Sequence, residues 1–220
     1  MPRGKFDPGF EELPARLPIF PLTGVLLLPS GRLPLNIFEP RYLAMTRAAL
    51  AGDRIIGMIQ PTEAERPDHP PALYGVGCAG RIIAFAETDD GRYQITLAGL
   101  VRFGIGREIA TSPEGYRQAE PDYAPYAADL DAEDVPELDR PRLLSALKGF
   151  FLRQGISGDW DAIDKTSDRL LVISLAMVCP FEPEEKQAML EAPSATERGR
   201  ILTALLEMSV LASANATARH

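Results

Sequence analysis

Two short apolar runs near the N-terminus are interrupted by proline, and they constrain the fold more than any other feature of this chain. Residues 17–22 read LPIFPL, and residues 33–42 read LPLNIFEPRY. Proline has no N–H to donate to a neighbouring strand, so in sheets it occurs at edges, strand starts and bulges. Two such runs close together predict a small irregular barrel whose hydrogen-bond ladder is incomplete at Pro18, Pro21 and Pro34.

The β-rich pattern continues to about residue 115. Between the second and third strands, residues 40–51 read as a helix, with Pro40 in its first turn and Gly52 at its C-terminal end. Asp90-Gly91 supplies the positive φ of a tight hairpin turn. Closely spaced strands with internal glycines favour a barrel over an open sheet. The expected strands are residues 16–22, 32–38, 54–60, 73–88 and 93–105.

The chain changes character near residue 115, where an acidic stretch with proline and tyrosine predicts an extended surface connector. Beyond it, apolar residues recur at helical spacing, and Ser194 and Glu197 form a capping box at the start of the last helix. The expected helices are residues 137–154, 160–179, 182–192 and 196–213. The predicted domains are a barrel over residues 1–115, the connector over 116–136, a helical bundle over 137–213 and a frayed tail over 214–220.

The charge distribution disfavours a phosphate-binding surface. The net charge of the 220 residues is −8. Residues 1–110 hold 12 basic and 12 acidic side chains, whereas residues 111–220 hold 11 basic and 19 acidic ones, so the second half accounts for the imbalance. Neutralising phosphates needs clustered Lys and Arg. A nucleic-acid partner is therefore not expected.

Metal-binding and membrane-spanning patterns are absent from the sequence. His69 and His220 lie at no ligand spacing from each other or from a cysteine, and Cys78 and Cys179 read as two buried hydrophobic residues. The longest apolar helix-like run, residues 170–179, is far shorter than the roughly 20 residues that a spanning helix needs. The N-terminus lacks the apolar core of a secretory signal. We therefore expect a cytoplasmic protein without metal, cofactor or membrane contact.

The sequence offers no convincing catalytic motif. It contains neither the glycine-rich P-loop that cradles nucleotide phosphates nor the G-x-S-x-G turn of serine hydrolases. Ser145 and Lys148 match S-x-x-K, the spacing at which lysine activates serine in penicillin-recognising enzymes. The accompanying S-D-N motif is missing, and both residues share a helix whose apolar face lies elsewhere. A solvated surface pair is the favoured interpretation, so no catalytic residue is expected.

Five segments together resemble, in order and spacing, the N-terminal substrate-binding domain of Lon proteases. They are residues 17–22, 33–42, 55–60, 75–80 and 99–103. The resemblance extends over roughly residues 15–210. It implies an α+β fold in which a PUA-like β pseudo-barrel with an inserted helix is followed by a C-terminal helical bundle. A related domain occurs in cereblon.

The resemblance also implies a function. In Lon this domain captures unfolded or tagged polypeptides and helps to assemble the hexamer, so a homo-oligomer is possible here. The ATPase and Ser-Lys peptidase modules of Lon have no counterpart in these 220 residues, which implies a free-standing, non-catalytic binding protein with a separate protease among its candidate partners.

We expect the bound chain to lie in an exposed apolar groove or on an open strand edge of the barrel. The candidate contacts are Phe20, Leu22, Phe38 and Tyr42. Two alternatives stay open. PUA-like barrels elsewhere bind RNA, and the cereblon likeness allows a small-molecule sensor.

Overall fold

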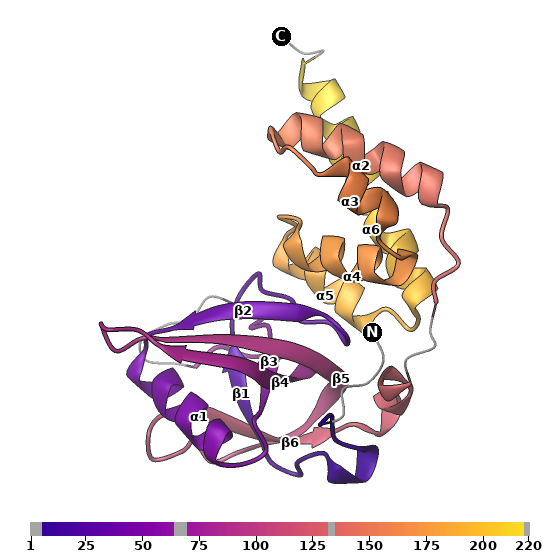
Figure 1. Cartoon of the computed structure of the whole chain (residues 1–220). Coiled ribbons are helices and arrows are strands. Elements are labelled where there is room, and N and C mark those ends of the chain that lie inside the picture. Colours follow the sequence, from indigo (N-terminus) through magenta and orange to yellow (C-terminus); the bar gives the residue numbers. More distant parts are fainter. Residues whose placement is uncertain (1–5, 64–69, 132–134, 218–220) are drawn as a thin grey trace. The chain divides into compact units, whose positions relative to one another are not determined.

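The computed structural model describes residues 6–63, 70–131 and 135–217 (Figure 1). The chain divides between residues 132 and 133 into two compact units. We call them the barrel unit and the helical unit. The barrel unit holds a sheet of six strands, whereas the helical unit contains only helices in its described part. The expected α+β fold is confirmed.

The barrel closes because one long strand pairs with different neighbours along its two halves. The strands follow the order β2-β5-β4-β3-β1-β6, and β6 pairs in turn with the far half of β5. Pairing is antiparallel throughout except between β1 and β3. This leaves β2 outside the ring, on the first half of β5. The strands are β1 (Leu17–Pro21), β2 (Arg32–Ile37), β3 (Ile55–Ile59), β4 (Val76–Glu87), β5 (Tyr93–Ile109) and β6 (Arg117–Asp122).

The three prolines of the opening runs all lie where a strand has a single recorded neighbour. Pro18 is paired with β6 but precedes the β1–β3 pairing, and Pro21 is paired with β3 but follows the β1–β6 pairing. Pro34 lies in β2, which pairs only with β5 in the described ranges. A missing N–H is tolerated at such positions because no second strand requires it. The predicted incomplete ladder is confirmed at these prolines.

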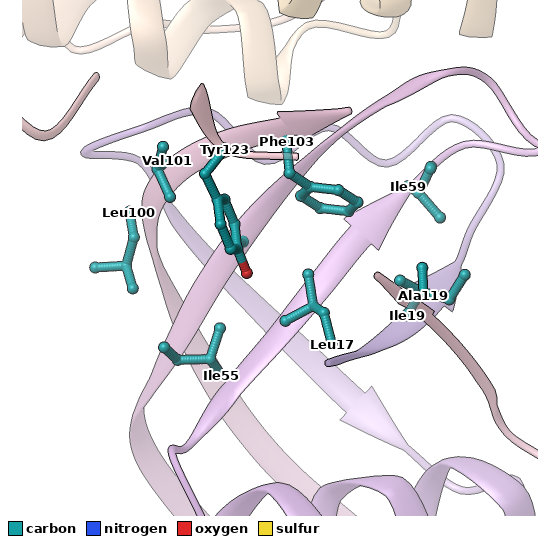
Figure 2. Close-up of a cluster of buried hydrophobic side chains, with 10 residues drawn as sticks. Leu17, Ile19, Ile55, Ile59, Leu100, Val101, Phe103, Ala119 and Tyr123 are labelled. Atoms are coloured by element: carbon teal, nitrogen blue, oxygen red, sulfur yellow. The ribbon is translucent and has the colours of Figure 1, made fainter. Parts of the chain in front are cut away.

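Apolar side chains from five strands and the following segment meet inside the barrel (Figure 2). The ring of Tyr123 lies 6.4 Å from that of Phe103, in an edge-on arrangement. Gly77 is required beside Phe103, since a Cβ there would lie 2.6 Å from both the Met58 carbonyl oxygen and the Phe103 ring. The buried cluster comprises Leu17, Ile19, Ile55, Ile59, Ala79, Leu100, Val101, Phe103, Ala119 and Tyr123.

Three short helical segments accompany the strands. Helix α1 (Pro40–Ala51) has the bounds predicted from Pro40 and Gly52 and contacts β1 and β3. The single-turn helix η1 (Phe10–Glu12) precedes β1. The 3-10 helix η2 (Ala124–Leu130) follows β6 and contacts β5.

Much of the expected connector over residues 116–136 is structure that belongs to the barrel, namely β6 and η2. Strand β6 pairs Ala119 with Leu17, and Ala119 is fully buried. Tyr126 and Leu130 of η2 pack against the core cluster. The barrel unit therefore extends to about residue 132 instead of 115. The sequence did not predict this strand, because acidic residues and proline dominate the stretch and Ala119 is the only fully buried side chain of β6.

The helical unit differs from expectation at one break. Residues 160–179 form two helices, because Ser167 adopts an extended conformation between them. The Arg140 guanidinium donates hydrogen bonds to the carbonyl oxygens of Ile163, Asp164 and Thr166, which terminates the first helix. The helices are α2 (Arg140–Gln154), α3 (Trp160–Lys165), α4 (Asp168–Val178), α5 (Pro183–Glu191) and α6 (Ala195–Thr217).

The predicted start of the last helix is confirmed, because the Glu197 N–H donates to the Ser194 hydroxyl oxygen at 3.1 Å. The backbone of α6 continues past the expected end at residue 213 into the segment expected to fray. Among the helices described, none has the length and apolar character needed to cross a membrane.

Candidate binding surface

The four predicted contact residues do not form one surface. Phe20 and Tyr42 are each 6% exposed, and their rings stack 4.2 Å apart where α1 meets β1. Leu22 is half-buried and its N–H donates to the Ile59 carbonyl oxygen at 3.0 Å. Phe38 alone is open to solvent, with 62% of its surface exposed. Phe20 and Tyr42 are therefore core residues in this structure, whereas Phe38 remains a candidate contact.

A groove lies across the part of the sheet formed by β2, β5 and β4. Figure 1 shows these strands side by side. Its volume is about 460 Å³. Thr96 is paired with Pro34 on one side and Ala84 on the other, and Gln94 is paired with Asn36 and Ala86. Paired residues point to the same face of a sheet. We call this the sheet groove; it is lined by Pro34, Leu35, Asn36, Ala84, Phe85, Ala86, Gln94, Ile95 and Thr96.

The sheet groove is open because its floor carries small side chains. Ala84 and Ala86 are both exposed and leave room above β4. A register shift between Ile82 and Ala84 interrupts the ladder there, as a β-bulge does. Phe85 alternates with Ala84 and Ala86, so its side chain lies on the other face of the sheet, where its ring is 5.0 Å from that of Tyr93. Ile83, at the register shift, is 39% exposed.

A second, smaller hollow lies at the first turn of α1. Its volume is about 130 Å³. Two arginines line it, but both have carboxylate partners: Arg41 lies 2.9 Å from Glu39, and Arg117 bonds to Glu108 and to the Pro71 carbonyl oxygen. A bound anion would therefore compete with existing ion pairs. The hollow is lined by Pro21, Arg41, Tyr42, Pro70, Pro71, Thr111, Gly115, Tyr116 and Arg117.

Ion pairing also occupies four further arginines described in the barrel unit. Burial works to lower the pKa of Arg102, but the hydrogen bond and charge of Asp129 outweigh it and raise the pKa. The hydrogen bond from Arg107 holds the pKa of Glu120 below its usual value. The barrel-unit pairs are Arg41–Glu39, Arg81–Asp7, Arg92–Asp90, Arg102–Asp129, Arg107–Glu120 and Arg117–Glu108. Arginines held in this way do not form a continuous positive surface.

Within the described ranges, no three residues of His, Cys, Asp or Glu are grouped so that they could hold a metal ion. Both cysteines are buried and reduced. Burial raises the pKa of the Cys179 thiol to about 11, which makes it a poor nucleophile near neutral pH.

Comparison with known proteins decides the family. The sequence model of the ATP-dependent protease La (LON) substrate-binding domain matches residues 16–208. The chain belongs to this family. The match covers the Lon substrate-binding domain and includes neither the ATPase nor the peptidase domain of Lon proteases.

Curated Lon proteases share this region with the chain. The Lon protease of Cytophaga hutchinsonii is 27% identical over 208 residues, which cover 91% of this chain and 25% of that protein. Lon protease 2 of Myxococcus xanthus is 31% identical over 117 residues, covering 51% of this chain and 14% of that protein. The chain thus spans about a quarter or less of the length of these relatives.

Two solved structures have the same fold as this Lon substrate-binding domain. A Lon N-terminal domain protein from Xanthomonas campestris superposes with a TM-score of 0.56 at 22% identity, covering 86% of this chain and 97% of that one. The N-terminal domain of the Mycobacterium avium complex Lon protease gives 0.54 at 19% identity, covering 87% and 97%. The predicted resemblance to the Lon N-terminal domain is confirmed.

Sequence reasoning missed most of the sheet groove of this Lon domain. Ala84, Ala86, Gln94 and Thr96 were not among the predicted contacts. One signal was present: Gln94 and Thr96 alternate with apolar residues, which indicates a face of the sheet outside the core. Pro34 added a second signal, since proline inside a strand indicates an edge.

Proposed function

We propose that this Lon substrate-binding domain captures unfolded polypeptide segments in the sheet groove and catalyses no reaction. The observation that carries the proposal is the groove of about 460 Å³ over the small, exposed side chains of Ala84 and Ala86. Burying apolar surface contributes about 25 cal/mol per Å². An unfolded segment can place one or two large apolar side chains in the groove and gain this binding energy. A folded partner keeps such side chains in its own core and gains less.

Two alternative ligands are less well supported. RNA would require clustered cations, but six arginines of the barrel unit are engaged with carboxylates. For a small-molecule ligand, the hollow of about 130 Å³ beside Arg41 and Arg117 is smaller than a typical ligand pocket of about 300 Å³ or more, and both guanidinium groups already have partners. We further propose that the protein acts in the cytoplasm, that a separate protease could receive the captured chain, and that the domain could self-associate.

Fluorescence anisotropy with a labelled, permanently unfolded protein tests the proposal. We expect saturable binding that does not depend on ATP. Ala86→Trp fills the groove and is expected to weaken binding about tenfold or more, the equivalent of about 1.4 kcal/mol. Ala48→Trp, at an exposed position of α1, is the matched control. Absence of binding by the parent protein, or equal affinities of the two variants, would overturn the proposal.

A further inference from the structure

We infer that the captured segment joins the barrel as an additional β-strand on the outer edge of β2, recognised through its backbone. The inference rests on the proposed function and specifies its ligand. The preferred segment is extended, carries apolar side chains at alternate positions and has a basic residue at one end. No strand in the described ranges pairs with this edge of β2.

The direction of the backbone groups of β2 follows from one hydrogen bond. The Gly99 N–H donates to the Gly31 carbonyl oxygen at 2.9 Å, just before the first strand pair, Arg32 with Ala98. Bonded and non-bonded pairs alternate along an antiparallel ladder. Leu33, Leu35 and Ile37 therefore direct their N–H and C=O groups toward β5. Pro34 and Asn36 direct theirs to the outer edge.

The outer edge thus offers backbone groups at defined positions. Asn36 presents an N–H donor and a C=O acceptor, whereas Pro34 presents only its C=O because proline has no N–H. An added strand can pair with both groups of Asn36 and donate one hydrogen bond to Pro34. Backbone pairing of this kind provides affinity that is independent of sequence, while alternate side chains provide selectivity.

The two faces of β2 determine which side chains the added strand should carry. Side chains paired with Pro34 and Asn36 would lie on the face of the sheet that bears the groove, at its β2 side. Alternate side chains would lie beside Leu33 and Leu35, which are half-buried in the structure. Both rows therefore offer apolar contact, and long side chains of the first row can reach over β2 into the groove.

Charge complementarity supports a basic residue at one end of the segment. The end of β2 at Ile37 lies in the row of Tyr93 and Glu87, next to the β4–β5 hairpin. The hairpin adds exposed Asp89 and Asp90, and Arg92 pairs with Asp90. Arg47 also lies here, since its guanidinium donates to the Tyr93 hydroxyl at 3.5 Å. Three carboxylates against two guanidinium groups still leave a net negative charge.

A labelled peptide of alternating Val and Ser provides the ligand-side test, with Lys at its N-terminal end, which lies beside Ile37 when the peptide pairs antiparallel to β2. One version is N-methylated at every Val and another at every Ser. Methylation removes the donor and blocks pairing, so the version methylated on the side facing β2 should bind about tenfold more weakly. The other version should bind within about threefold of the parent peptide. Equal affinities of the two methylated peptides would overturn strand addition.

The protein-side test uses three substitutions on the edge. Asn36→Pro removes the outward N–H and should weaken binding about tenfold, whereas Asn36→Ala keeps that N–H and should change affinity by less than about threefold. Pro34→Ala adds an N–H at the edge and should tighten binding by about threefold. Circular dichroism and thermal melts verify that each variant is folded; Pro34→Ala and the methylated peptides test the idea even if Asn36→Pro does not fold.

Failure of this inference can be told apart from failure of the proposed function. If Ala86→Trp abolishes binding of the unfolded protein while backbone methylation and the Pro34 and Asn36 substitutions have no effect, the groove binds side chains without strand addition. If neither the peptide nor the unfolded protein binds the parent chain, the proposed function fails first. Replacing the terminal Lys by Glu should weaken binding at low salt, and unchanged affinity would refute the basic end.

Discussion

The carboxylate of Asp129 accepts three hydrogen bonds from Arg102, at 3.0 Å from the backbone N–H, 2.8 Å from Nε and 2.8 Å from Nη2. The Arg102 guanidinium also lies 4.8 Å from the centre of the Tyr126 ring. Both contacts join η2 to β5. The Arg102 and Asp129 side chains are only 8% and 12% exposed, so the ion pair is largely shielded from water. It fastens the end of the barrel unit to β5.

Removing one partner of this ion pair should destabilise the barrel unit strongly. Asp129→Ala leaves the Arg102 guanidinium buried without its counter-charge, for which we expect a loss of about 3–5 kcal/mol in the free energy of unfolding. Glu120→Ala is the control, because the Arg107–Glu120 pair is exposed and its loss should cost less than about 1 kcal/mol. Urea denaturation followed by tyrosine fluorescence measures both. Similar small losses would contradict the assigned role.

Replacing glycine by alanine should lower the stability of the protein at Gly77 but not at Gly75. At Gly77 a Cβ would lie 2.6 Å from the Met58 carbonyl oxygen and from the Phe103 ring, so Gly77→Ala should cost about 1–3 kcal/mol through overpacking. At Gly75 the same Cβ meets nothing within 4 Å, so Gly75→Ala should stay within about 0.5 kcal/mol of the parent. Chemical denaturation decides, and equal effects would disprove the close approach.

Two phenylalanines of the opening runs should differ in how much their replacement by alanine destabilises the protein. Phe20 is 6% exposed and stacks on Tyr42, so Phe20→Ala should lower the free energy of unfolding by about 3–5 kcal/mol. Phe38 is 62% exposed, so Phe38→Ala should change stability by less than about 0.5 kcal/mol. If Phe38 contacts the captured segment, its loss should weaken binding of unfolded protein. Denaturation and anisotropy together test both statements.

The buried Cys179 thiol should make the helical unit lose stability in alkali. Burial raises its pKa to about 11 in the folded state, above the usual value of about 8.5 for an exposed thiol. Because the folded pKa is the higher one, the stabilisation is complete below pH ~8.5 and is lost as the pH rises towards 11. Denaturation at several pH values should show a steeper decline for the parent than for Cys179→Ala. Parallel declines would refute the assignment.

Local chemistry in the sequence predicted those elements whose ends are set by neighbouring residues. Pro40 and Gly52 bound α1, Gly91 adopts a φ of +80° in the predicted hairpin, and Ser194 caps α6. Each of these depends on contacts within a few residues, so the pattern alone contains the information. The resemblance to the Lon domain then supplied the order of the two units.

Closure of the barrel and the identity of its open surface depended on contacts between distant residues. Leu17 pairs with Ala119, about a hundred positions away. No pattern in the acidic sequence of β6 predicts that pairing. Phe20 and Phe38 occupy similar proline-containing runs, yet one is buried against α1 and the other faces solvent.

The prolines of the opening runs distinguish what the sequence determines from what the tertiary structure determines. The sequence alone determined that Pro18, Pro21 and Pro34 interrupt the ladder, because a missing N–H is a property of the residue itself. Only the tertiary structure decided that Pro18 and Pro21 lie within a closed ring while Pro34 lies on an edge beside a groove. That outcome depends on which strands meet, and packing of the whole barrel core sets it.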